Sequence, residues 1–248
     1  MKERIYTIPV NDAFNEPCEC PLCELEAKTS KDLLAYFMGP SMMEPDIRIG
    51  TNKKGFCKAH STAMYNLQEN RLGLGLMLQT HQADLCDDLN VKLAQSVPTA
   101  ESGFQARRKS DYRTNLVKLA EEVGERVSSC ALCDRMEYTM ERYIDVILWQ
   151  YFEDDAFREK FEKTKGFCLP HLSILLRGVA KHLSRKETAV FMNNLSILQN
   201  HSMDTMRDEL LWFTRKFDYK NEKEPWGNSR DAVPRTIRKM VGNSNLNQ

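Results

Sequence analysis

Eight residues of the chain form a pattern that is typical of metal binding. Two CxxC pairs occur, and each is followed about 35 residues later by a CxxH pair. The cysteine of each CxxH pair is the last residue of a Lys-Gly-Phe-Cys motif. Cys130 lies 110 residues after Cys20, and Cys168 lies 111 residues after Cys57. The near-equal offsets indicate that one unit is written twice. The first copy offers Cys20, Cys23, Cys57 and His60, and the second offers Cys130, Cys133, Cys168 and His171.

Three thiolates and one imidazole are a ligand set that zinc prefers. Such a set closes a tetrahedral site with about 2.3 Å to each sulfur and about 2.0–2.1 Å to nitrogen. The loaded site carries a net charge of −1, and both ligand pairs fall at predicted helix N-termini, where negative charge is favoured. Four protein ligands leave no open position, so the site would be structural. We expect two zinc ions per chain, one in each half.

Other chemistries of cysteine fit the pattern less well. A disulfide framework is unusual in an intracellular chain, and a thioredoxin-like CxxC would need a βαβ setting. An iron–sulfur cluster with one histidine ligand is the main alternative cofactor. Cys18 could replace Cys20 as a ligand, but Ser128 occupies the matching place in the second copy, which favours Cys20.

A quieter repeat consists of a histidine and two aspartates at positions i, i+3 and i+7. On a helix these three side chains fall within roughly 60° of one another. If the two triplets faced each other, they could hold a further metal or perform acid–base chemistry. A solvated or hydrogen-bonded flank is the favoured interpretation, because both triplets lie off the apolar stripes. No residue is therefore assigned as catalytic; the candidates are His81, Asp84, Asp88, His201, Asp204 and Asp208.

Composition excludes several classes of protein. The 248 residues contain 35 Lys+Arg and 35 Asp+Glu, so no basic field favours nucleic acid. The opening residues lack the apolar run of a secretory signal, and no apolar segment is long enough to cross a bilayer. We therefore expect a soluble cytoplasmic protein with no membrane partner.

Helix-forming residues dominate, and no alternating strand pattern persists, so the fold class is predicted to be mostly α. We expect an N-terminal zinc-binding unit at 1–95, a linker at 96–110, a C-terminal zinc-binding unit at 111–219 and a tail at 220–248. Residues 1–19 are expected to be extended, and 41–54 to form a loop around Pro45 and Gly50. Ser184 and Glu187 have the spacing of a capping box that opens a long helix.

The sequence also resembles a known family. The motifs that carry the resemblance extend over nearly the whole chain: Ile8-Pro9-Val10-Asn11-Asp12-Ala13-Phe14, the Cys20–Cys23 pair, the two Lys-Gly-Phe-Cys motifs with Pro170-His171, and Pro225-Trp226-Gly227-Asn228-Ser229. They are similar to those of a bacterial family, frequent in anaerobic Firmicutes, that is described only as a domain of unknown function. The resemblance implies a cytoplasmic bacterial protein with paired cysteine-rich units, and it implies no activity.

Taken together, these observations favour a zinc-stabilised helical protein that acts as a binding or scaffolding module for a protein or small-molecule ligand. The alternative is a metal-dependent enzyme with a site at the junction of the two units, built from the pairs His81/Asp84 and His201/Asp204. Nucleic-acid binding is a third and weaker hypothesis, because phosphate contacts need a basic surface.

Overall fold

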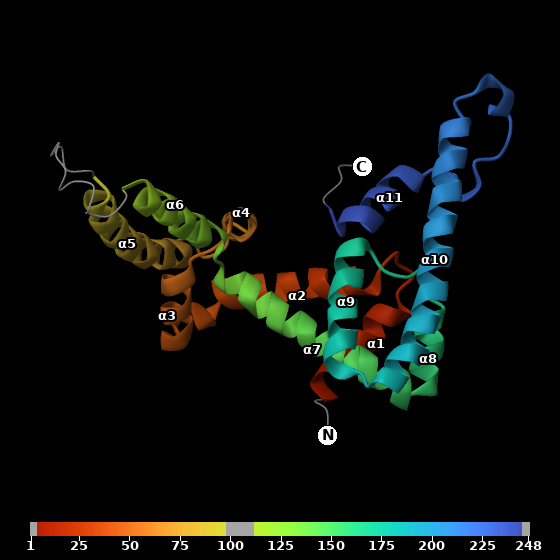
Figure 1. Ribbon diagram of the computed structural model, residues 1–248, viewed down its shortest axis with the longest axis horizontal. Helices are drawn as coiled ribbons and strands as arrows, with labels where there is room; N and C mark the ends of the chain where they lie inside the picture. The colour runs from red at the N-terminus through yellow and green to blue at the C-terminus, as the bar shows by residue number, and fades with distance from the viewer. Residues whose placement is uncertain (1–3, 98–111, 245–248) are drawn as a thin grey trace. The chain divides into compact units, whose positions relative to one another are not determined.

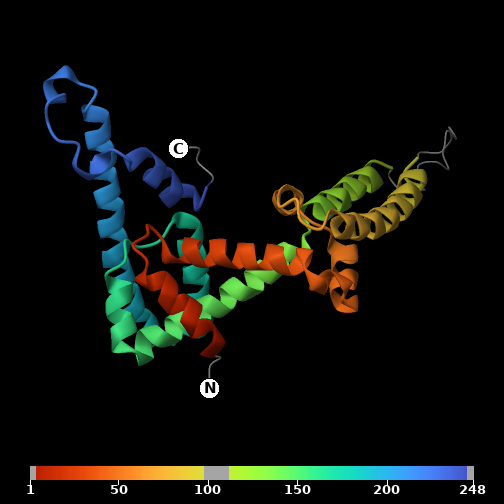
Figure 2. The same cartoon turned by 180° about the vertical axis from the view of Figure 1, so that it is seen from behind.

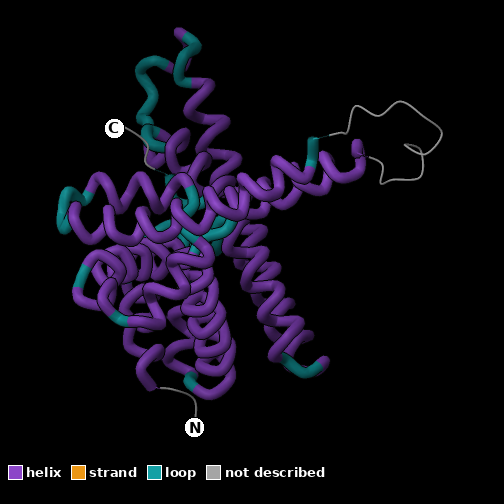
Figure 3. Tube along the Cα trace, turned by 90° about the vertical axis from the view of Figure 1, so that its left-hand side faces the viewer, coloured by secondary structure: helices purple, strands orange, loops and turns teal. Residues whose placement is uncertain are grey.

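The computed structural model describes residues 4–97 and 112–244. Within these ranges every regular element is a helix and no strand occurs, as Figure 3 shows. The mostly α fold is thus confirmed. The chain divides into two compact units: unit 1 contains Met1–Thr29 and Tyr138–Gln248, and unit 2 contains Ser30–Glu137. Unit 2 is therefore inserted into the sequence of unit 1. Two long helices, α2 (Pro21–Met38) and α7 (Ala131–Glu153), belong partly to each unit.

Unit 1 is a helical assembly with an aromatic core. The ring of Phe161 lies 5.1 Å from that of Tyr151, 5.3 Å from Phe191 and 5.5 Å from Phe167. Phe14 packs on the same group, 4.9 Å from Phe157. These rings join α1, α7, α8, α10 and the segment before α9. The helices are α1 (Thr7–Asn15), α2 (Pro21–Met38), α7 (Ala131–Glu153), α8 (Asp155–Glu162), α9 (Leu169–His182), α10 (Arg185–Arg215) and α11 (Ala232–Val241), with short turns η1 (Arg4–Tyr6), η4 (Tyr219–Asn221) and η5 (Gly227–Ser229) (Figure 1).

The start of α10 follows directly from its sequence. The Ser184 hydroxyl accepts a hydrogen bond from the Glu187 backbone N–H, and the Glu187 carboxylate accepts one from the Ser184 N–H. The predicted capping box is confirmed. It satisfies donors that the first turn of a helix otherwise leaves unpaired.

Unit 2 has a smaller core rich in methionine. Its buried side chains include Phe37, Met64, Leu74, Met77 and Leu132. Its helices are the second part of α2, η2 (Pro40–Met43), α3 (Pro45–Lys54), α4 (Lys58–Asn66), α5 (Arg71–Gln95), α6 (Tyr112–Ser128) and the start of α7. Helices α5 and α6 lie side by side (Figure 2). Ion pairs between them join Lys92 to Glu122 and Arg126 to Asp88.

Two expectations about local structure are wrong. The extended segment expected at 1–19 is helical over Arg4–Asn15 in the described residues, because η1 is followed directly by α1. Pro9 lies in the first turn of α1, where a missing N–H costs nothing. The expected loop at 41–54 contains η2 and α3, since Pro45 occupies the first position of α3 and Gly55 ends it with a φ of 63°.

The units interleave along the chain, whereas the repeat predicts consecutive halves at 1–95 and 111–219. The predicted linker at 96–110 lies almost wholly outside the described residues. Part of the predicted tail at 220–248 packs into unit 1 as α11.

Candidate metal centres

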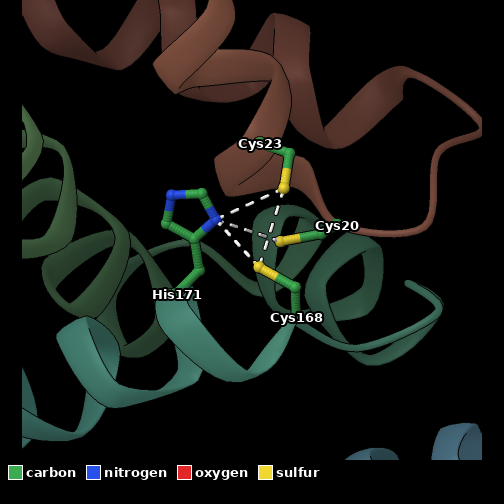
Figure 4. A group of neighbouring side chains, drawn as sticks. All are labelled: Cys20, Cys23, Cys168 and His171. Carbon is green, nitrogen blue, oxygen red and sulfur yellow. Dashed lines mark hydrogen bonds between the residues drawn. The ribbon is translucent and has the colours of Figure 1, made fainter. Parts of the chain in front are cut away.

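Four predicted ligands converge in unit 1. The Nδ1 atom of His171 lies 3.7 Å from the sulfur of Cys20, 3.4 Å from that of Cys23 and 3.1 Å from that of Cys168. The sulfurs of Cys23 and Cys168 are 3.6 Å apart. All four side chains are buried and point toward one another (Figure 4). We call this group the unit 1 cluster.

Two helix starts bring these ligands together. Cys20 and Cys23 flank the first turn of α2, where the Cys23 N–H donates to the Cys20 carbonyl. Cys168 is the N-cap of α9, and His171 lies one turn further along. Pro170 fits that first turn because no hydrogen bond is required of its nitrogen. The partial positive charge of both helix ends faces the thiols, which favours thiolates.

The Lys-Gly-Phe-Cys motif forms a tight bend before α9. Gly166 has a φ of 75°, a conformation that favours glycine. The Gln199 side chain brackets the next residue, since its Oε1 accepts from the Phe167 N–H and its Nε2 donates to the Phe167 carbonyl, both at 2.9 Å. Phe167 is fully buried in the aromatic core. The bend therefore fixes the position of Cys168.

Unit 2 holds a second group with nearly the same geometry, the unit 2 cluster. The Nδ1 atom of His60 lies 3.3 Å from the sulfur of Cys57, 3.4 Å from Cys130 and 3.3 Å from Cys133. The sulfurs of Cys57 and Cys133 are 3.7 Å apart. Cys57 is the N-cap of α4, as Cys168 is of α9, and Gly55 also has a positive φ.

Each cluster takes its CxxC pair from one sequence copy and its CxxH pair from the other. Cys20 and Cys23 meet Cys168 and His171, whereas Cys130 and Cys133 meet Cys57 and His60. The prediction that each consecutive half supplies all four ligands of its own site is therefore wrong in its pairing. In every cluster the four ligand atoms lie within 4.8 Å of one another. Each compact unit thus has one group of four residues that could hold a metal ion.

The protonation of the ligands is strongly coupled within the clusters. Hydrogen bonds from Cys168 and Cys23 lower the pKa of Cys20, while those to Cys168 and Cys20 raise the pKa of Cys23. Burial alone would lower the pKa of His171, but hydrogen bonds to Cys168 and Cys20 outweigh it and raise the pKa to about 10. Burial is the main cause that raises the pKa of Cys133 to about 12, and a hydrogen bond with Cys130 adds to it. Metal ligands must be deprotonated, so binding at neutral pH would release protons.

Residues outside the eight ligands differ between the clusters. In unit 1, Nε2 of His171 faces the Glu26 carboxylate at 3.5 Å. The buried ammonium of Lys239, on α11, donates to the carbonyls of Glu19 and Lys165, next to the two ligand pairs. In unit 2 the side chains of Cys57, His60 and Cys133 are only half-buried. The sequence repeat gives no signal for Glu26 or Lys239, because neither belongs to a repeated motif.

The two cysteines outside the repeat do not join the clusters. Cys18 is half-buried, and burial raises the pKa of its thiol to about 11. It does not belong to the unit 1 cluster, where Cys20 is the residue present. Cys86 is exposed on α5.

The first histidine–aspartate triplet lies in unit 2 and is engaged locally. His81 Nδ1 lies 2.6 Å from the Asn52 carbonyl, and its ring packs against Gly55. Asp84 accepts from the Asn52 amide. Asp88 pairs with Lys92 and Arg126. His81 therefore supports the bend before Cys57, much as Gln199 supports the bend before Cys168.

The second triplet lies in unit 1, and its three side chains do not meet at a common site. His201 is exposed, and Asp204 and Asp208 both pair with Arg207. His201 lines a polar cleft of about 740 Å³ together with Lys165, Glu209 and Arg235. Neither triplet forms a group of three possible metal ligands in the part of the chain that the structure describes.

Residues 1–247 match the sequence model of a protein family described as a family of unknown function, DUF6062. No curated protein and no solved structure matches the chain. None of the described helices is both long and apolar enough to cross a membrane.

Proposed function

The chain belongs to DUF6062, a family of unknown function, and we propose that it is a helical binding or scaffolding protein whose two units are each stabilised by one zinc ion. The observation that carries the proposal is the meeting of three sulfurs and one Nδ1 within 4.8 Å, in both units. Neither cluster could form from one sequence copy alone, so an ion in each would join segments that are far apart in the chain.

The distances support a single ion over a cluster. Four ligands at zinc bond lengths around one tetrahedral ion place two sulfurs about 3.8 Å apart, and sulfur and nitrogen about 3.5 Å apart. The sulfurs of Cys23 and Cys168 are 3.6 Å apart, and those of Cys57 and Cys133 are 3.7 Å apart. The sulfur–nitrogen distances range from 3.1 to 3.7 Å. An iron–sulfur cluster attaches its ligands to different irons and would hold them farther apart.

A structural role follows from the closed ligand set. Four protein ligands leave no position for a substrate or an activated water. Binding free energies of such sites, on the order of 10–16 kcal/mol, are large enough to decide whether a small helical unit folds. Reduced thiolates also suit the cytoplasm, where disulfides are rare.

The enzyme alternative has weaker support. Asp84, Asp88, Asp204 and Asp208 are all engaged by neighbouring amides or cations, and His81 is bonded to a backbone carbonyl. Nucleic-acid binding is disfavoured by the equal numbers of acidic and basic residues.

Elemental analysis of protein purified without added metal tests the proposal. We expect close to two zinc ions per chain and no visible absorbance. Exhaustive chelation should lower helicity, measured by circular dichroism, and expose the cluster thiols to a thiol reagent. Iron in the sample, together with visible absorbance, would indicate iron–sulfur clusters in place of zinc ions. A chain that keeps its helicity and melting temperature after complete metal removal would contradict the proposal.

A further inference from the structure

Helix α11 has its apolar face toward solvent and its charged face toward the protein. Met240 and Val241 are 55% and 61% exposed, and Val233 and Ile237 share their side of the helix. On the opposite side Lys239 is only 1% exposed. A surface helix of a soluble protein normally has the reverse orientation. The charged face is buried because Lys239 donates hydrogen bonds to the carbonyls of Glu19 and Lys165, beside the unit 1 cluster.

Helix α9 also has an apolar outer face. Its inner face buries His171, Leu175 and Val179. On the other side, Leu169, Leu172, Leu176 and Ala180 line a shallow, largely open groove of about 460 Å³ together with Ser173 and Arg177. Leu169 is 44% exposed, although a helix that is apolar on both sides is normally covered on both.

The two helices contact each other within unit 1 (Figure 1). A Cβ atom on Gly242, the residue that ends α11, would lie 3.7 Å from Cγ of Pro170 at the start of α9. The unit 1 cluster lies beneath this junction, since the same Cβ would be 3.9 Å from the Cys168 sulfur. The unit 1 cluster therefore lies where the end of α11 meets the start of α9.

The acidic side chains beside these helices, Glu141, Asp145 and Asp231, are each paired with a basic side chain of α9 or α11. The charges that remain unpaired on the two helices are positive. Neither helix contains Asp or Glu within Leu169–His182 or Ala232–Val241. Arg177 lines the groove, Arg238 follows Ile237, and neither has an ion pair among the residues that the structure describes. A second copy would bring like charges together, which disfavours self-association. A lipid surface would favour exposed Trp or Tyr, and the outer faces carry aliphatic side chains around a groove.

We propose that the outer faces of α9 and α11 dock an amphipathic helix of a partner protein that has acidic residues beside its apolar stripe. Aliphatic side chains of that helix, at spacings of three and four residues, would occupy the α9 groove. Its carboxylates would pair with Arg177 and Arg238. This inference deepens the proposed function and rests on it, because it names what the scaffold binds.

Selection from a displayed library of random amphipathic helical peptides tests the proposal, with the metal-loaded full chain as bait. The selected peptides should share aliphatic residues at helical spacing, flanked by Asp or Glu. Leu176→Glu and Ile237→Glu should each weaken binding of a selected peptide at least about tenfold, equivalent to about 1.4 kcal/mol. Ile197→Glu, an exposed isoleucine on α10, should leave it unchanged.

Charge reversal tests the recognition of carboxylates. Arg177→Glu should weaken binding of the acidic peptide, and a peptide whose flanking acids are replaced by lysine should bind this variant better than the original chain. Metal content is measured on every sample. Zinc loading without peptide binding overturns the docking proposal alone, whereas a chain without zinc overturns the proposed function.

Other outcomes also overturn the docking proposal. Selected peptides without the acidic apolar pattern would do so, as would equal binding to the Ile237→Glu variant. Binding to phosphatidylserine vesicles that Ile237→Glu abolishes, with no peptide selected, would assign the surface to a membrane instead.

Discussion

Glu26 faces His171 at 3.5 Å from Nε2, on the ring edge opposite the nitrogen that faces the three thiols. Both residues belong to unit 1, on α2 and α9. A carboxylate in this position fixes the tautomer and orientation of a metal-binding imidazole and raises its basicity. Glu26 is therefore expected to position His171 rather than to bind metal itself.

Glu26→Gln should weaken zinc binding in unit 1. Loss of such a carboxylate typically costs 10–100-fold in metal affinity, and because Glu26 is partly exposed we expect about tenfold. Competition with a chromophoric chelator measures the effect, in a Cys57→Ser background that leaves only the unit 1 cluster complete. Asp32→Asn, on the exposed side of the same helix, is the control. Equal affinities in the two variants would exclude the positioning role.

The crossed pairing of the ligands predicts the metal content of double variants. Cys20→Ser with Cys168→Ser removes two ligands of one cluster, so one zinc ion should remain. Cys20→Ser with Cys57→Ser damages both clusters, so both ions should be lost or much weakened. Mass spectrometry under native conditions counts the bound ions. The opposite result, with one ion retained only by the second pair, would mean that each sequence copy binds its own metal.

The bends before Cys57 and Cys168 predict that two glycines are essential. Gly166→Ala would place a side chain at a φ of 75° and 2.9 Å from Oε1 of Gln199, and Gly55→Ala would collide with the His81 ring. The backbone conformation alone costs about 1–2 kcal/mol. Thermal unfolding should show a lower melting temperature for both variants.

Gly50→Ala is the matched control for these glycines. Gly50 lies inside α3, and a Cβ there would have nothing within 4 Å. Alanine in a helix interior is favoured by about 0.5–1 kcal/mol, so this variant should be unchanged or more stable. A Gly166→Ala protein as stable as the Gly50→Ala protein would show that the bend is not under this constraint.

The unequal burial of the clusters predicts unequal metal exchange. Three ligands in unit 2 are half-buried, whereas all four in unit 1 are buried and lie beside the Lys239 contacts. Chelation should therefore release one ion quickly and the other slowly. Lys239→Met should accelerate the slow phase, because it leaves two backbone carbonyls without their donor.

Stopped-flow absorbance with a zinc-binding dye measures both phases. The Cys57→Ser variant identifies the fast phase by removing it, and Lys186→Met, an exposed lysine on α10, is the control for loss of charge. A single exchange rate for both ions in the unmodified chain would contradict the prediction.

The eight clustered residues could be predicted from sequence because their signal is local. CxxC and CxxH spacings place two ligands on one turn, whatever the rest of the fold does. The pairing could not be predicted, because both copies offer the same ligand pairs and either combination completes two sets. Which combination forms depends on how the helix starts that carry the ligand pairs pack within each unit, and on contacts between residues 70 to 151 positions apart.

Other errors have similarly physical causes. Pro45 favours the loop predicted at 41–54, but it occupies the first position of α3, where its missing N–H costs nothing. The repeated histidines suggested matched roles, yet His81 supports a bend while His201 is exposed, and Gln199 supports the equivalent bend in unit 1. Glu26 and Lys239 gave no sequence signal, because the second copy has Met136 at the position of Glu26 and the α11 segment is not repeated.

Because unit 2 is inserted within unit 1, the ribosome completes the two sets of ligands in a fixed order. The inner cluster has all its ligands once Cys133 has left the exit tunnel, whereas Cys20 and Cys23 must wait until His171 is made. The thiols of Cys20 and Cys23 thus remain longest without their partner ligands, and during that time they can bind other metals or be oxidised. In the folded chain they lie in the more buried of the two clusters. A newly made chain would mature from its middle outward.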